Sequence, residues 1–99
     1  MAQTASWSDL LENNTPELMK VVSGARESIT AEGALSNKTK VLMTMLCDAL
    51  LGHDSGVKTI ANRARTAGAS EDEIAETVGV AFLMGGLPAL VTGSNAFRK

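Results

Sequence analysis

The chain has 99 residues, of which 44% are hydrophobic and 20% charged, so it is long enough for one domain and too short for two. Eleven acidic and nine basic side chains give a formal net charge of −2, which does not provide the basic surface that binds a nucleic-acid backbone. The composition predicts a single domain over residues 1–99 that does not bind nucleic acid.

The sequence also predicts where the protein resides. A single cysteine, Cys47, cannot form an intramolecular disulfide, which favours a reducing, cytoplasmic setting. The first ten residues contain no Lys or Arg and no apolar run, so we expect no export signal. The strictly apolar stretch Val78–Val91 is shorter than the roughly 20 residues of a membrane span, and it contains a Gly-Gly pair and a proline. We therefore expect a soluble protein.

The N-terminal third predicts two helices, because its apolar residues recur at helical spacing and no Asn-Gly or Asp-Gly hairpin turn occurs in the chain. Ser6 or Ser8 can cap a short helix that ends around Asn13 and Asn14. A second helix starts at Pro16 after the N-cap Thr15 and stops before Gly33. The apolar face expected on this second helix consists of Leu18, Val21, Val22, Ala25 and Ile29.

Two further helices are expected to form a central hairpin. Residues 36–51 carry only a narrow polar stripe of Lys40, Thr44 and Asp48, so this helix is predicted to be buried nearly all round, with Cys47 as an inert buried thiol and the methionines as core filling. After Gly52 a helix opens near Asp54 or Ser55 and ends at a left-handed cap at Gly68. Its expected inward residues are Val57, Ile60, Ala61 and Ala64; its expected solvent-facing residues are Lys58, Asn62, Arg63 and Arg65.

The last third predicts a well-capped helix and a break. Ser70-Glu71-Asp72-Glu73 is a capping box, in which Ser70 and Glu73 satisfy each other's backbone N–H groups. Gly85-Gly86 ends this helix and Pro88 starts the last one. The inner stripe before the break is Ile74, Ala75, Val78, Ala81 and Phe82. The whole chain is predicted to be an all-α bundle of about five to six helices.

Few residues in this chain are typical of catalysis. There is no Tyr, one His and one Cys, and neither a glycine-rich phosphate loop nor ligands at metal spacing occur, so we expect no metal and no cofactor. His53 lies between Gly52 and Asp54 at a junction between helices, where it can serve in a site or simply form a local hydrogen bond. The residues alone leave both alternatives open.

Two motifs at fixed spacing resemble a known family. The run Leu35-Ser36-Asn37-Lys38-Thr39-Lys40, followed by an apolar helix, Gly52 and the segment Gly68-Ala69-Ser70-Glu71-Asp72-Glu73-Ile74, resembles the core of the carboxymuconolactone decarboxylase family, which includes the AhpD-like alkylhydroperoxidases. Gly86-Leu87-Pro88-Ala89 is similar to the family's Gly-x-Pro-Ala before its last helix. The resemblance covers about residues 10–97 and implies an AhpD-like helical bundle with one unit per chain.

The resemblance implies a catalytic segment that this chain does not keep. AhpD-like members carry Cys-x-x-Cys-x-x-x-His and an upstream glutamate. Aligned without gaps on Gly52 and Gly68, the two cysteines fall on His53 and Gly56, the histidine on Ile60 and the glutamate on Val41. Reduction of a peroxide by a dithiol needs a reactive thiolate and a resolving thiol, and neither is present at these positions. The family's decarboxylases keep a histidine at the position of Ile60, so that acid–base group is also lost.

Two functions from different classes remain open. In the first, the protein keeps the family pocket after Gly52 and acts on a small organic acid, with His53 as general acid or base and Asp48, Asp54, Ser55 and Lys58 as pocket candidates. The activity would be decarboxylase-like or other acid–base chemistry and not thiol peroxidase chemistry. In the second, the chain is a non-enzymatic scaffold or partner-binding protein. In both, single-unit members of the family imply a homo-oligomer, a trimer or a hexamer, and the all-round apolar helix and uncharged C-terminal third also favour assembly.

Overall fold

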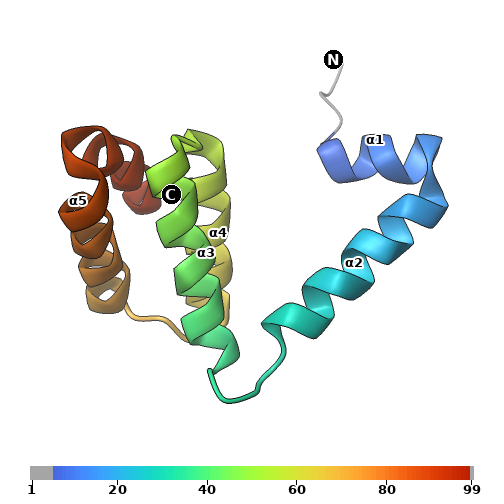
Figure 1. Cartoon of the computed structure of the whole chain (residues 1–99), viewed down its shortest axis with the longest axis horizontal. Coiled ribbons are helices and arrows are strands. Elements are labelled where there is room, and N and C mark those ends of the chain that lie inside the picture. The colour runs from blue at the N-terminus through green and yellow to red at the C-terminus, as the bar shows by residue number, and fades with distance from the viewer. Residues whose placement is uncertain (1–5, 99) are drawn as a thin grey trace. The chain divides into compact units, whose positions relative to one another are not determined.

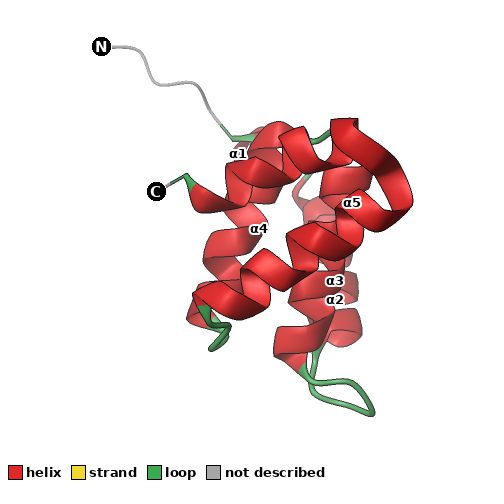
Figure 2. Ribbon diagram, turned by 90° about the vertical axis from the view of Figure 1, so that its left-hand side faces the viewer, coloured by secondary structure: helices red, strands yellow, loops and turns green. Residues whose placement is uncertain are grey.

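The computed structural model describes residues 6–98, and this part of the chain consists of five α-helices and one short 3₁₀ helix without any strand (Figure 2). The predicted all-α class and number of helices are therefore confirmed. The helices form two compact units, one up to Ala31 and one from Glu32 onwards. Each unit is described by itself below.

The first unit contains α1 (Trp7–Asn14) and α2 (Pro16–Thr30). Ser6 caps α1 as predicted, since its hydroxyl accepts a hydrogen bond from the Asp9 N–H at 3.2 Å. Thr15 precedes Pro16 as expected, but its side chain makes no capping hydrogen bond. Neither α1 nor α2 contains a buried residue, so the apolar face expected on α2 is not covered within this unit.

The second unit contains α3 (Asn37–Leu51), α4 (Asp54–Thr66), α5 (Glu71–Gly93) and the 3₁₀ helix η1 (Ser94–Phe97). α3 and α4 form the predicted hairpin, and α3 packs against both α4 and α5 (Figure 1). The core lies between these helices and consists largely of small side chains, which allow close approach of the backbones. Its buried members are Met45, Ala49, Val57, Ala61, Ala64, Ala69, Ile74, Val78, Ala81, Ala89 and Ala96.

The prediction that the central helix is buried nearly all round is wrong. Within α3 only Met45 and Ala49 are buried, while Met43, Leu50 and Leu51 are exposed. Cys47 is also exposed, so the expectation of a buried thiol is wrong as well. An apolar pattern shows that a face avoids water, but it does not show whether the same chain covers that face.

α5 is not one straight helix. Gly86 adopts φ 72° and ψ −160°, a conformation suited to glycine, and Pro88 follows it, so the helix breaks where the sequence predicted. The segment Glu71–Phe97 is long and apolar enough to cross a membrane by length and composition. Both straight parts of α5 are nevertheless shorter than the roughly 20 residues of a span, and the first packs Ile74 and Val78 into the core. Phe82, which was expected on the inner stripe, is exposed.

Candidate functional site

The turn between α3 and α4 holds His53 in place through the backbone. Gly52 ends α3 with φ 78°, a left-handed conformation that favours glycine. This turn directs the His53 N–H back to the carbonyl oxygen of Asp48 at 2.9 Å, which closes the last turn of α3. His53 then serves as the N-cap residue of α4. The residue that starts one helix is thus fixed to the last turn of the preceding one.

The side chains of the same two residues are also bonded. His53 Nδ1 lies 2.8 Å from Asp48 Oδ1, a distance typical of a strong hydrogen bond between an imidazole and a carboxylate. The Asp48 side chain is 23% exposed and the His53 side chain 56% exposed. Asp48 is acceptor-only when ionised, so in the neutral imidazole Nδ1 carries the proton and Nε2 has a free lone pair. The structure therefore brings together two of the predicted site residues.

The other predicted pocket residues lie beside this pair without bonding to it. Asp54 and Ser55 are the first two residues of α4 and are exposed, and Lys58 is exposed one turn further along the helix. In the described part of the chain Asp48 is the only side chain hydrogen-bonded to His53. Asp54, Ser55 and Lys58 remain candidates by position.

Two of the four positions that the resemblance assigned to catalytic groups lie in apolar surroundings. Val41 and Ile60 are partly buried and pack against the core of the second unit. Ile60 therefore lies on the inward face of α4, as its spacing predicted, and contributes packing.

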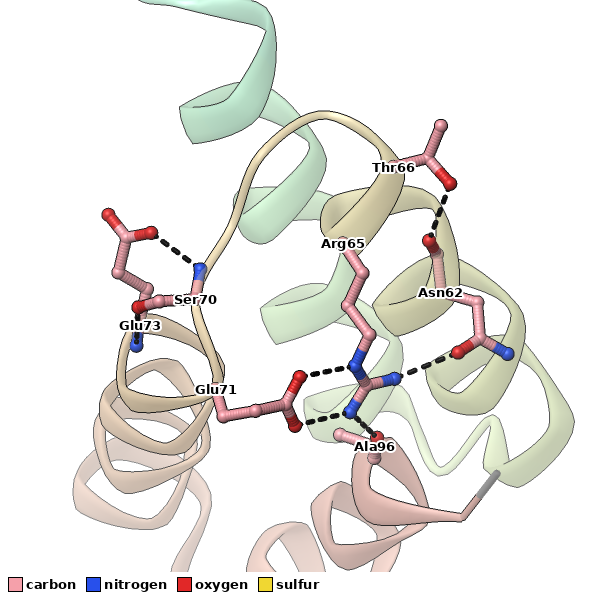
Figure 3. Close-up of polar contacts among 7 residues, drawn as sticks. All are labelled: Asn62, Arg65, Thr66, Ser70, Glu71, Glu73 and Ala96. Atoms are coloured by element: carbon pink, nitrogen blue, oxygen red, sulfur yellow. Dashed lines mark hydrogen bonds and ion pairs between the residues drawn. The ribbon is translucent and has the colours of Figure 1, made fainter.

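The opposite end of the hairpin contains a polar cluster that the sequence analysis missed, since Arg65 was expected to face solvent. Arg65 is only 18% exposed and donates from Nε and Nη2 to the two carboxylate oxygens of Glu71 at 2.6 and 2.9 Å (Figure 3). It also donates to the Ala96 carbonyl oxygen and to Asn62 Oδ1, both at 2.8 Å. The hydrogen bond that Arg65 donates to Glu71 stabilises the cation and raises the pKa of Arg65. This guanidinium joins α4, α5 and η1.

A second ion pair joins the two motifs that carry the family resemblance. Lys38 Nζ lies 2.8 Å from Glu73 Oε2, which links the first turn of α3 to the first turn of α5. Glu73 also completes the predicted capping box, because its side chain accepts from the Ser70 N–H while the Ser70 hydroxyl accepts from the Glu73 N–H (Figure 3). Hydrogen bonds from Lys38 and from the Ser70 backbone lower the pKa of Glu73. These contacts hold the start of α5 against the start of α3.

Comparison with known proteins agrees with this architecture. The sequence model of the carboxymuconolactone decarboxylase family matches residues 16–99. A solved structure, the apo form of lpg0406, a carboxymuconolactone decarboxylase family protein from Legionella pneumophila, is similar with a TM-score of 0.82 and 30% sequence identity over 88% of this chain and 78% of that chain. No curated protein matches the chain.

The fold and these matches define the class of the protein. It is an all-α bundle protein with its polar pair at the turn of a central helical hairpin. It belongs to the carboxymuconolactone decarboxylase family. The predicted family resemblance is therefore confirmed.

Proposed function

We propose that this family member has lost dithiol peroxidase chemistry and instead transfers protons on a small organic acid through His53. The observation that carries the proposal is the 2.8 Å hydrogen bond between His53 Nδ1 and Asp48 Oδ1. A carboxylate in this position fixes the tautomer and the orientation of an imidazole and stabilises the imidazolium that forms when Nε2 takes up a proton. His53 and Asp48 thus provide the arrangement of an acid–base pair.

The proposed step needs no thiol and no metal. His53 Nε2 removes a proton from the carbon next to the substrate carbonyl or carboxylate, and the electron pair of the C–H bond remains on the substrate as an enolate. In a decarboxylation the C–C bond to the carboxylate breaks instead and CO₂ leaves, and Nε2, already protonated from solvent, delivers its proton to the carbon that keeps the electron pair. Lys58 provides a cation near the start of α4 that can pair with the substrate carboxylate. Asp54 and Ser55 follow His53 at the start of α4 and are the remaining candidates for contact with the substrate.

Solvent hydrogen exchange tests this activity without knowledge of the natural substrate. A panel of small 2-oxo, 3-oxo and lactone carboxylic acids is incubated with the protein in D₂O and followed by NMR for deuterium uptake and loss of CO₂. We expect at least one acid to react, and His53→Gln to reduce the rate about 10²–10⁴-fold. The control Thr59→Ala alters an exposed residue of the same helix and should retain the rate. Reaction that is unchanged in His53→Gln contradicts the proposal.

A peroxidase assay tests the loss of thiol chemistry separately. Cys47 is the only thiol of the chain, and it lies on α3 and not at the position of either family cysteine. We expect no consumption of peroxide with a dithiol reductant beyond that of the free reductant. Turnover that persists in Cys47→Ser means that the active site lies elsewhere, because no thiol then remains.

The alternative function is that of a non-enzymatic scaffold or partner-binding protein. The observation that favours it is the exposure of His53, since a base that works in water loses the advantage of a desolvated site. The exchange experiment separates the two: a scaffold assembles normally and exchanges none of the acids. The Asp48–His53 pair is then a local structural hydrogen bond.

We also propose that the protein is a homo-oligomer, a trimer or a hexamer. In support, α5 exposes a run of large apolar side chains, with Leu83 77% and Met84 74% exposed, and Leu87 and Val91 continue it. Exposed apolar surface of this kind is typical of protein interfaces. Sedimentation equilibrium should show the assembly, and Leu83→Lys should weaken it, while Glu76→Lys, which changes an exposed polar residue of the same helix, should not. A stable monomer at micromolar concentration contradicts the proposal.

A further inference from the structure

Gly56, the third residue of α4, is a glycine that the backbone does not require. Among the described residues positive φ values occur only at Gly52, Gly68 and Gly86, so Gly56 has a helical conformation that any residue can adopt. Glycine inside a helix is less favourable than alanine because it loses more conformational freedom on folding. Its presence in α4 therefore needs another cause.

The space in which a side chain at position 56 would lie is filled by the carboxylate of Asp48. A Cβ atom on Gly56 would lie 2.8 Å from Asp48 Oδ2, 3.0 Å from Cγ and 3.2 Å from Oδ1. All three distances are shorter than ordinary van der Waals contacts. The Oδ1 atom is the one that accepts the hydrogen bond from His53 Nδ1. Gly56 thus touches the same group that orients the imidazole.

The position of the Asp48 carboxylate beside the first turn of α4 is electrostatically favourable. The first turn of α4 is the positive end of that helix, which is favourable for a carboxylate. Asp48 has a short side chain, so a rotation that removes the contact with a Cβ at position 56 also moves Oδ1 away from His53. Such a rotation therefore weakens the hydrogen bond with His53 Nδ1.

We infer that Gly56 is a positioning residue: the absence of its side chain allows Asp48 to lie against α4 and to hold the proton of His53 on Nδ1. This inference rests on the proposed function, because it assigns a role to Gly56 within the same acid–base pair. Its consequence is that a side chain at position 56 and the Asp48–His53 pair exclude each other. Position 56 aligns without gaps with the second cysteine of the family motif. The Asp48–His53 pair therefore requires glycine at this position.

The tautomer of the single histidine reports this role directly. The chain contains one His, so the imidazole signals in a long-range ¹H–¹⁵N spectrum belong to His53 without assignment. The spectrum is recorded at a pH of about 9, where histidine side chains are neutral. We expect Nδ1 to carry the proton in the parent protein. In Gly56→Ala the Nε2–H form, which predominates for histidine in water, should become the major one, as it should in Asp48→Ala.

Gly79→Ala is the matched control, because Gly79 is also helical, has no positive φ and would meet no atom within 4 Å. It should leave the tautomer unchanged. In the background of Asp48→Ala, Gly56→Ala should have no further effect on the tautomer, and it should be tolerated there even if the single variant unfolds. Unfolding of Gly56→Ala with rescue by Asp48→Ala supports the inference, and unfolding without rescue overturns it.

The outcomes distinguish this inference from the proposed function. If Asp48→Ala shifts the proton to Nε2 but Gly56→Ala does not, the role of Gly56 is wrong and the acid–base pair stands. If neither variant changes the tautomer, the pair itself does not orient His53, and both proposals fail. If both variants shift the proton and the exchange of organic acids is still absent, the positioning role is correct and only the catalytic function is wrong.

Discussion

Replacement of Arg65 by lysine tests the polar cluster at the far end of the hairpin. Lysine keeps the charge but has one nitrogen in place of the planar fork, so it cannot donate to the Glu71 carboxylate, Asn62 and the Ala96 carbonyl together. The Ala96 residue is fully buried, which makes its carbonyl the contact that is most costly to leave without a donor.

The magnitude follows from the exposure of each partner. An unsatisfied buried acceptor costs about 1–3 kcal/mol. Glu71 is 56% exposed on its side chain, so its ion pair with Arg65 is screened by water and contributes only about 0–1 kcal/mol. We therefore expect Arg65→Lys to lower the free energy of unfolding by about 1–4 kcal/mol, against a total on the order of 5–15 kcal/mol.

Urea denaturation followed by circular dichroism measures this difference. All variants are compared at one protein concentration, since assembly would make the apparent stability depend on it. Arg63→Lys is the control, because Arg63 is exposed on the same helix. This substitution should change the free energy of unfolding by no more than about 0.5 kcal/mol. Glu71→Gln should cost less than Arg65→Lys, because the bond to Ala96 remains. If Arg65→Lys is no more destabilising than Arg63→Lys, the guanidinium does not join the three elements.

Three further predictions concern the start of α5. Ser70→Ala removes the N-cap acceptor and should lower the free energy of unfolding, measured in urea, by about 1 kcal/mol. This loss should be smaller than that of Ile74→Asp, which buries a charge in the core. Equal losses would mean that Ser70 is more than a cap. Gly68→Val should also cost more than Ser70→Ala, because Gly68 has φ 101° and a β-branched residue is strained there; a neutral result in the same titration contradicts this. The hydrogen bonds from Lys38 and Ser70 lower the folded-state pKa of Glu73 below its unfolded value, so its pair with Lys38 contributes stability above the unfolded pKa and loses it as the pH falls through the folded-state pKa. The difference in unfolding free energy between the parent protein and Glu73→Gln should therefore be constant near neutral pH and shrink in acid, and a difference that grows in acid would falsify the assigned direction.

Helix positions could be predicted from the sequence because their signals are local. The capping box at Ser70 and Glu73, the left-handed Gly68 and the break at Gly86 each depend on residues a few positions apart, and all three occur where expected. The inward face of α4 is also as predicted, since Val57 and its neighbours at helical spacing are buried.

The surface of the central helix could not be predicted in the same way. Met43, Leu50 and Leu51 follow the same apolar pattern as the buried Met45, but they are exposed. A periodic pattern identifies apolar residues, and only the packing of distant elements decides which of them the chain itself covers. The exposure of Cys47 has the same origin.

The candidate site was predicted in its members but not in its geometry. His53 and Asp48 were both candidates, but their hydrogen bond depends on the turn at Gly52, which brings the fifth residue after Asp48 back to it. The role of Arg65 was missed because one of its acceptors, the Ala96 carbonyl, lies 31 positions further along the chain. No local pattern in the sequence indicates a contact over that separation.

The separation of these two polar clusters makes the predictions independent of one another. α3 has 15 residues and is therefore about 22 Å long, with Lys38 in its first turn and Asp48 in its last. Lys38 and Arg65 stabilise the end at which α5 begins, while His53 lies at the other end, where α4 begins. Changes at distant sites without shared partners usually act additively, so Arg65→Lys should leave the tautomer of His53 unchanged, although it destabilises the fold. Stability and the chemistry proposed for His53 can thus be altered one at a time in this protein.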